Sequence, residues 1–154
     1  MGTWGISPVV PSLVIPPDTI MEFHTRYQVG QDISLLAVNP HMHLLGKSFK
    51  AYAVTLKKDT IPLVWIKNWD FRWQFYYTFR NMIKIPMGSA IIAEGVFDNT
   101  AENPLNPNFP PKTVIEPDHS MKTTDEMFQL IFSYLPYKEG DESIDLSKSE
   151  FFQD

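Results

Sequence analysis

The feature that most constrains the fold of this chain is a strict alternation of side chains between residues 127 and 134. A period of two is typical of a β-strand with one face in a core and the other on a less buried side. One set of alternate side chains is wholly apolar and consists of Phe128, Leu130, Phe132 and Tyr134. The other set is mixed and consists of Met127, Gln129, Ile131 and Ser133. We therefore expect a strand here whose mixed face lies outside the deep core.

Short apolar runs bounded by turn-forming residues predict further strands. They cover residues 21–27, 32–38, 47–56, 61–66, 90–97 and 123–134. The aromatic-rich stretch 68–79 alternates with polar residues and predicts one or two strands lying on a sheet. Aromatic residues make up 14% of the chain and there are 13 prolines, which favours a β-rich fold over a helical bundle. We predict a single-domain, all-β fold, an antiparallel jelly-roll-like β-sandwich.

The chain is expected to have three parts. Residues 1–18 are rich in proline and predict a lead-in or edge segment. Residues 19–137 would form the sandwich, and residues 138–154 an acidic, frayed tail. The first five residues lack the basic and apolar regions of a signal peptide, and we interpret them as a start added to an excised piece.

Composition argues against several kinds of partner. The net charge of −5 disfavours binding to nucleic acid or to an anionic membrane surface. No apolar run approaches the length of about 18 residues that a membrane-spanning helix needs, so we expect no membrane span. Cysteine is absent, so the fold uses no disulfide, and a metal site would depend on histidine, methionine or carboxylate ligands.

His41 and His43 are separated by a single residue. On an extended strand such a pair projects from one face, while Met42 and Leu44 turn the other way into apolar packing. Two imidazoles converging from one strand supply two of the ligands of a three-coordinate metal site. A surface pair that binds no metal is the alternative interpretation.

Met127 is the candidate third ligand, because a thioether on the mixed face of the last predicted strand has no evident packing role there. Two imidazoles and a thioether form a soft, low-coordinate set that suits copper, especially Cu(I), better than zinc or calcium. A simple packing role for Met127 is the alternative. His24 and His119 are solitary and read as surface or hydrogen-bonded histidines, although His119 precedes the last strand closely enough to act as a further ligand.

Three segments occur in an order that resembles a known family. They are His41-Met42-His43-Leu44-Leu45-Gly46-Lys47, Gly95-Val96-Phe97-Asp98-Asn99 and Thr123-Thr124-Asp125-Glu126-Met127. Their order and spacing resemble the C-terminal domain of the copper type II, ascorbate-dependent monooxygenases, which include peptidylglycine α-hydroxylating monooxygenase and dopamine β-monooxygenase. The resemblance implies that His41, His43 and Met127 bind copper, with no catalytic residue beyond these ligands.

In that family, the copper held by two histidines and a methionine is where dioxygen is activated to hydroxylate a substrate C–H bond. A second copper, in an N-terminal domain across a solvent-filled cleft, supplies an electron, and ascorbate restores the reduced state. The resemblance therefore implies a second copper-bearing domain or chain as partner, a reductant such as ascorbate, and an extracytoplasmic location, periplasmic or secreted. Asp125 and Glu126 would hold the approach to the last strand through hydrogen bonds, and Gly46 and Lys47 would shape the turn after the histidines.

Departures from the family pattern limit what the resemblance implies. Nothing in this chain resembles the N-terminal copper domain, so coupled turnover is not expected of the isolated domain. The animal enzymes have cysteines at the positions of Gly95 and Phe128, which we expect to lie on neighbouring strands. The peptide-amidating enzyme binds its substrate carboxylate through an arginine and a tyrosine where this chain has Asn39 and Ile131. A glycine-extended peptide is therefore not the expected substrate.

The leading hypothesis is the oxygen-activating mononuclear copper domain of a monooxygenase that hydroxylates C–H bonds. A non-catalytic copper-binding or interaction module on the same scaffold is the alternative. A third hypothesis is a metal-free sandwich whose aromatic stretch, residues 69–79, binds glycan, and it predicts binding that survives His41→Ala. The substrate, the physiological reductant and the oligomeric state stay open.

Overall fold

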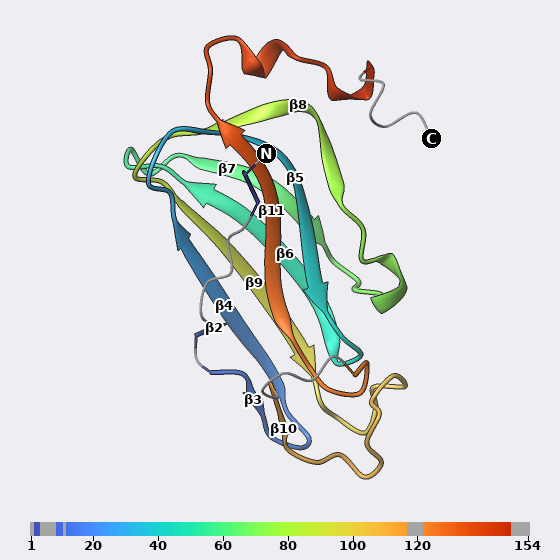
Figure 1. Cartoon of the computed structure of the whole chain (residues 1–154). Helices are drawn as coiled ribbons and strands as arrows, with labels where there is room; N and C mark the ends of the chain where they lie inside the picture. Colours follow the sequence, from blue (N-terminus) through green and yellow to red (C-terminus); the bar gives the residue numbers. More distant parts are fainter. Residues whose placement is uncertain (1, 4–8, 11, 117–121, 149–154) are drawn as a thin grey trace.

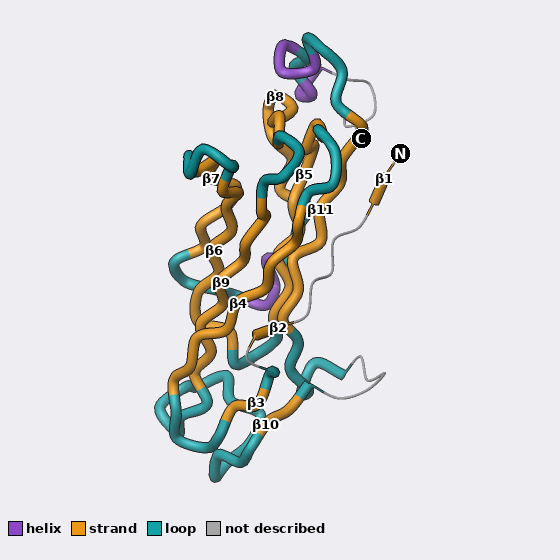
Figure 2. Tube along the Cα trace, turned by 90° about the vertical axis from the view of Figure 1, so that its left-hand side faces the viewer, coloured by secondary structure: helices purple, strands orange, loops and turns teal. Residues whose placement is uncertain are grey.

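The computed structural model describes residues 2–3, 9–10, 12–116 and 122–148 of the chain. Within these residues the regular structure consists of strands and three short 3-10 helices, with no α-helix. Two antiparallel sheets form the layers of a sandwich, which Figure 1 shows face on and Figure 2 from the side. The prediction of a single-domain, all-β antiparallel sandwich is confirmed.

One layer is a four-stranded sheet with the strand order β1-β11-β5-β8. Its strands are β1 (Gly2–Thr3), β11 (Phe128–Pro136), β5 (Ile33–Met42) and β8 (Tyr77–Ile85). Strands β5 and β11 therefore pair in the middle of this sheet although they are distant in sequence.

The other layer is a five-stranded sheet with the strand order β2-β4-β9-β6-β7. Its strands are β2 (Val9–Val10), β4 (Ile20–Gln28), β9 (Ala90–Asp98), β6 (Gly46–Val54) and β7 (Thr60–Ile66). A small two-stranded sheet of β3 (Val14–Ile15) and β10 (Val114–Ile115) lies at one end of the sandwich (Figure 1).

Aromatic rings from the two layers meet in the core. Phe128 of β11 packs edge-on against Phe49 of β6 and Phe97 of β9, with ring centroids 5.6 and 5.8 Å apart. All three rings are at most 1% exposed, and the burial of each stabilises the fold by roughly 1.5–3 kcal/mol. These contacts join β11 to β6 and β9 of the opposite sheet.

The alternation expected in the last strand is present in β11. Phe128, Leu130 and Phe132 are buried, and Gln129 and Ile131 are only half-buried. The strand begins at Phe128 and not at residue 123, because residues 122–125 form a turn in which the Asp125 N–H bonds to the Lys122 carbonyl. The mixed face of β11 therefore points away from the core, as the sequence pattern predicts.

The aromatic-rich stretch 68–79 differs from expectation, since only its end is a strand. Trp69 is buried in the core, and residues Phe71–Trp73 form a 3-10 helix, η1. This helix begins where the Asp70 carboxylate accepts a hydrogen bond from the Arg72 backbone N–H, a local side-chain contact that competes with strand pairing. β8 then starts at Tyr77 and continues beyond the predicted stretch.

Two further 3-10 helices, η2 (Asp141–Ser143) and η3 (Leu146–Lys148), follow β11 and lie against β8. Leu146 is buried there. The division of the chain at residues 18 and 137 stays a prediction. In the part of the chain that the structure describes, no helix has the length and apolar character needed to cross a membrane.

Gly95 and Phe128 lie against each other, but from opposite layers. Gly95 is on β9 of the five-stranded sheet and Phe128 on β11 of the four-stranded sheet, so the expectation of neighbouring strands is wrong. A Cβ atom added at Gly95 would lie 2.7 Å from Cε2 of Phe128 and 3.1 Å from the sulfur of Met42. The glycine is required because the phenylalanine ring occupies the space of its missing side chain.

We predict that Gly95→Ala lowers the free energy of unfolding by about 1–3 kcal/mol, because the new methyl group overpacks the core against Phe128. Chemical denaturation measures the change. Gly30→Ala is the matched control, since no atom lies within 4 Å of an added Cβ there. Combining Gly95→Ala with Phe128→Leu should recover part of the loss, and strictly additive losses would contradict the steric explanation.

Candidate metal centre

The two histidines lie side by side at the end of β5. Met42 between them is fully buried, so His41 and His43 project from the opposite, outward side of the sheet. Their Nε2 atoms are 3.1 Å apart, and the ring planes meet at 78° with centroids 5.0 Å apart. Leu44, expected to point inward, is half-buried in the following turn, and Leu45 takes the buried position.

The ring orientation of His43 is set by the segment that precedes β11. Its Nδ1 lies 2.7 Å from the backbone carbonyl oxygen of Asp125. A carbonyl oxygen only accepts hydrogen bonds, so Nδ1 carries the proton. In the neutral ring the lone pair is then on Nε2, which is the atom that faces His41. A metal-binding histidine commonly donates its other ring N–H to a backbone carbonyl, and this hydrogen bond fixes the orientation of the ring.

His41 is held toward its neutral form. Burial lowers the pKa of its ring, and the neighbouring His43 lowers it further, while the side-chain amide of Gln74 acts in the opposite direction. Gln74 Oε1 is buried and has no well-aligned hydrogen-bond partner among the described residues. The two rings thus bring nitrogen donors together at one point on the outer side of the sheet.

A buried carboxylate joins this pair to the start of β11. Glu126 Oε1 accepts hydrogen bonds from the backbone N–H groups of His43 and Met127, and Oε2 accepts one from Leu45. Burial raises the pKa of the Glu126 carboxyl from 4.5 to about 7, although the three N–H donors favour its charged form. The carboxylate therefore holds the turn after the histidines to the segment that carries Met127.

Met127 lies one residue before the first pair of the β5–β11 ladder, in which Phe128 faces Met42. Continuing the register by one step places Met127 opposite His43, and residues opposed in antiparallel strands project to the same side. Both backbones bond to the same oxygen of Glu126. Met127 itself is half-buried. The structure thus brings the segment of Met127 beside the histidine pair.

One of the other two histidines, His24, lies away from this pair. His24 lies on β4 in the opposite sheet and is exposed, paired in register with Glu94 of β9. His119 lies outside the described residues. Among the residues that the structure describes, no group of three or more histidine, cysteine, aspartate or glutamate side chains is arranged to hold a metal ion. Met127 therefore stays the candidate third ligand, and His119 stays a further candidate.

Two aromatic side chains of the segment before β8, Trp69 and Phe71, contact His43. The Phe71 ring of η1 packs edge-on against the His43 ring at 5.4 Å, and Trp69 Nε1 donates a hydrogen bond to the His43 carbonyl at 3.2 Å. Gly46 allows this approach, because an added Cβ would lie 2.6 Å from the Trp69 ring. Sequence reasoning missed the contacts of Phe71 and Gln74, and only the unusual aromatic density around them could have indicated a role.

The donor set fits copper. Two imidazole nitrogens that face one point, with one ring oriented by a carbonyl, match the ligands that copper shares with other borderline metals. A neighbouring thioether would favour Cu(I) over zinc. His41, His43 and Met127 are the residues that would hold such an ion, and no acidic side chain is needed in the set.

Comparison with protein-family models matches residues 6–108 to the family described as copper type II ascorbate-dependent monooxygenase, C-terminal domain. The matched stretch covers more than half of the chain and includes both histidines, and it ends before Met127. A search of curated proteins gave no match.

We predict that the stability of the metal-free protein depends on pH through Glu126. Between pH 4.5 and about 7 the folded protein binds more protons at this carboxyl than the unfolded chain does. The free energy of unfolding should therefore fall as the pH rises through this range and then level off. Glu126→Gln, which cannot ionise, should remove this fall and leave the opposite trend from His41, whose pKa is lowered in the folded protein, as measured by urea denaturation at several pH values. Glu102→Gln, at an exposed loop position, should keep the fall, and an unchanged slope in Glu126→Gln would contradict the assignment.

Proposed function

The chain belongs to the C-terminal domain family of the copper type II ascorbate-dependent monooxygenases, and we propose that it holds the copper ion at which dioxygen is activated. The single observation that carries the proposal is the approach of His41 Nε2 and His43 Nε2 to 3.1 Å, with the proton of His43 directed to the Asp125 carbonyl. His41, His43 and Met127 are the proposed ligands.

The proposed roles follow from the contacts of each side chain. The Asp125 carbonyl keeps the proton of His43 on Nδ1, and so leaves Nε2 free for a metal ion. Glu126 holds the backbones of His43 and Met127 at a fixed separation. Phe71 packs edge-on against one side of the His43 ring and restricts its movement. Bound copper would supply the one-electron chemistry that activates dioxygen for hydroxylation of a C–H bond.

The outward position of the pair supports a role for a partner. A metal site on the outer face of the four-stranded sheet can face a second domain, and we propose that a second copper-bearing domain or chain delivers electrons across a cleft. Ascorbate or a similar small reductant would restore the reduced state. We further propose an extracytoplasmic location and jelly-roll connectivity, both of which rest on the family.

The copper proposal predicts one equivalent of Cu(I) bound per chain, measured by competition with a chromophoric Cu(I) chelator under anaerobic conditions. His41→Ala should weaken binding by about tenfold or more, since one of few ligands is lost. His43→Ala should weaken it similarly, but it also removes a nearly buried ring, so a stability measurement must accompany it. His24→Ala, an exposed histidine of the opposite sheet, is the matched control and should bind as the parent does.

X-ray absorption tests the proposed Met127 ligand separately from the two histidines. X-ray absorption of the Cu(I) protein should show a sulfur scatterer that disappears in Met127→Ile, while the two nitrogen scatterers stay. A sulfur signal that persists in Met127→Ile, or its absence from the parent, would exclude Met127 as a ligand. Cu(I) affinity equal in His41→Ala, His24→Ala and the parent protein would overturn the copper site as a whole.

The enzymatic role predicts that copper-loaded domain and ascorbate alone give no coupled hydroxylation, whereas addition of the copper-bearing partner domain restores oxygen consumption matched to product. A domain that binds copper tightly yet stays inactive with its partner would instead be the non-catalytic copper module.

A further inference from the structure

Strand β7 is an edge strand of the five-stranded sheet, and within the described residues its outer edge has no strand partner. It pairs with β6 on its other side, and Figure 2 shows it at the margin of its layer. An unpaired edge presents backbone N–H and C=O groups to which another extended segment can bond. Pro62 is the one residue of β7 that has no N–H to donate. The backbone of β7 can therefore accept one further strand.

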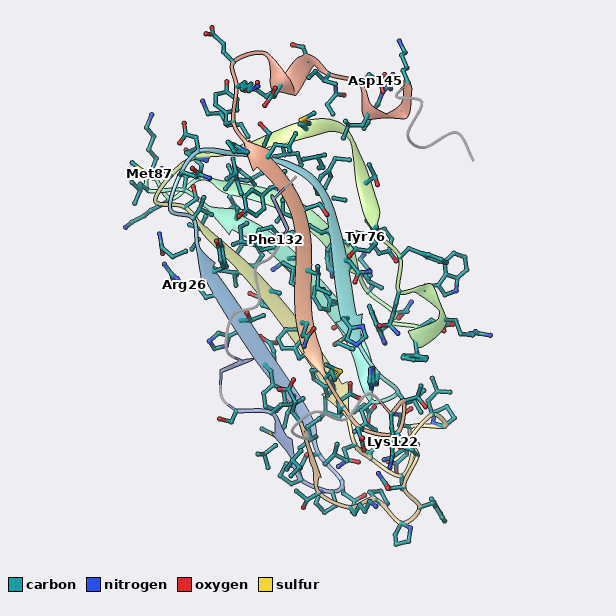
Figure 3. The ribbon with its side chains drawn as sticks, in the orientation of Figure 1. Arg26, Tyr76, Met87, Lys122, Phe132 and Asp145 are labelled. Carbon is teal, nitrogen blue, oxygen red and sulfur yellow. The ribbon has the colours of Figure 1, made fainter. Side chains whose placement is uncertain are left out.

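The neighbouring edge, on β8 of the other layer, is covered over part of its length. Asp145 forms a β-bridge with Asn81 of β8 and an ion pair with Arg80 at 3.4 Å. Figure 3 shows Asp145 above β8, in the segment that follows β11. Leu146 of this segment and Met82 of β8 are both buried. The contacts of this segment thus leave β7 as the open edge on this side of the sandwich.

A groove of about 680 Å³ lies beside β7 and is lined from both layers. Its lining includes Leu63, Val64 and Trp65 of β7 and Phe79 and Ile83 of β8. Its volume lies in the range of ligand-binding pockets. In a strand added to β7, every second side chain would point toward the space between the layers. The groove therefore fits a segment with apolar side chains at alternate positions.

Lysines are present at both ends of β7. Lys57 and Lys58 lie in the turn before the strand, and Lys67 directly follows it. All three are exposed, and in the described part of the chain none of them forms an ion pair. The Lys67 ammonium lies over the Trp65 ring, and Asp59 in the turn offsets one of the charges at that end. Each end of the strand keeps a net positive charge and attracts a carboxylate.

The same charges disfavour a second copy of this chain as the occupant. Antiparallel pairing of two β7 edges would place Lys57 and Lys58 of one copy beside Lys67 of the other, and parallel pairing would place identical lysines together. Like charges placed opposite each other destabilise strand pairing. Residues 46–85 contain eight of the 13 lysines and arginines but two of the 18 acidic residues, in a chain of net charge −5. This charge distribution favours an acidic partner.

We propose that the free edge of β7 binds an extended segment of a partner polypeptide, with carboxylates at its two ends and apolar side chains at alternate positions between them. The backbone of the segment pairs with β7, and its apolar side chains enter the groove. Its carboxylates bond to Lys57 or Lys58 at one end and to Lys67 at the other. The site lies on the sheet opposite the one that carries His41, and it does not depend on the proposed copper centre.

A synthetic peptide of the same length as the seven-residue β7 tests the proposal. The peptide is acetyl-Glu-Phe-Thr-Val-Thr-Phe-Asp-amide with a fluorescent label. Fluorescence anisotropy with the full chain at low salt should show it binding about tenfold more tightly than the same peptide with lysine in place of both acidic residues. Proline in place of the central valine should also weaken binding several-fold, because proline interrupts backbone pairing. Equal binding of the three peptides, or no binding of the acidic one, would overturn the proposal.

Variants of the full chain locate the binding site. Lys57→Glu and Lys67→Glu should each weaken binding of the acidic peptide several-fold, and Trp65→Ala should do the same because Trp65 lines the groove. Lys112→Glu changes the net charge equally at an exposed loop position, and it is the matched control that should bind as the parent does. Equal losses in all three glutamate variants would show attraction by net charge alone and would overturn the site.

Hydrogen exchange measured by NMR identifies the occupant of the edge. Alternate amides of β7 should become protected when the acidic peptide is added, and protection confined to other strands would overturn the proposal. The same protection in the chain alone, appearing as its concentration rises, would show that a second copy occupies the edge. Phe151→Ser combined with Phe152→Ser should leave peptide affinity unchanged. A large gain in affinity would show that this part of the chain itself competes for the groove, and the partner segment would then be wrong.

Discussion

The hydrogen bonds of the Glu126 carboxylate determine how the candidate centre is built. One buried carboxylate accepts the backbone N–H groups of His43, Leu45 and Met127, and so connects the end of β5 to the segment that enters β11. Burial disfavours the charged form of this carboxyl group, whereas the hydrogen bonds from the three N–H groups favour it. Each buried donor left unpaired would cost about 1–3 kcal/mol. The relative position of the two segments is therefore set by hydrogen bonds between this side chain and the backbone.

Most of the fold could be predicted from local patterns. The alternation in residues 127–134 identified both the last strand and its inward face, because a period of two is a direct consequence of strand geometry. The same reasoning was wrong for residues 68–76, where the Asp70 side chain binds the Arg72 backbone and starts a 3-10 turn. It also placed Gly95 and Phe128 on neighbouring strands. The grouping of strands into sheets depends on packing between segments that are distant in sequence. The local spacing of residues carries no information about that packing.

The part of the candidate site that lies within one short stretch of sequence could be predicted. The His-x-His spacing on a strand indicated two rings on one face, and the structure has them there. The Asp125 carbonyl on His43 and the approach of Gln74 to His41 were not predictable, since both join segments that are far apart along the chain. The aromatic stretch was interpreted as sheet surface, but part of it lines the histidine pair through Phe71.

The bond between the His43 backbone and Glu126 spans 83 residues, and this separation affects the order of events during synthesis. The histidine pair leaves the ribosome well before the strand that completes its surroundings. A nascent chain would offer metal ions a mobile pair of imidazoles without Glu126 or Met127. Non-local pairing of this kind forms late and slowly in β proteins. Incorporation of the proposed copper ion is thus expected to follow folding of the domain, so that metal binding would report that the central strand pair has closed.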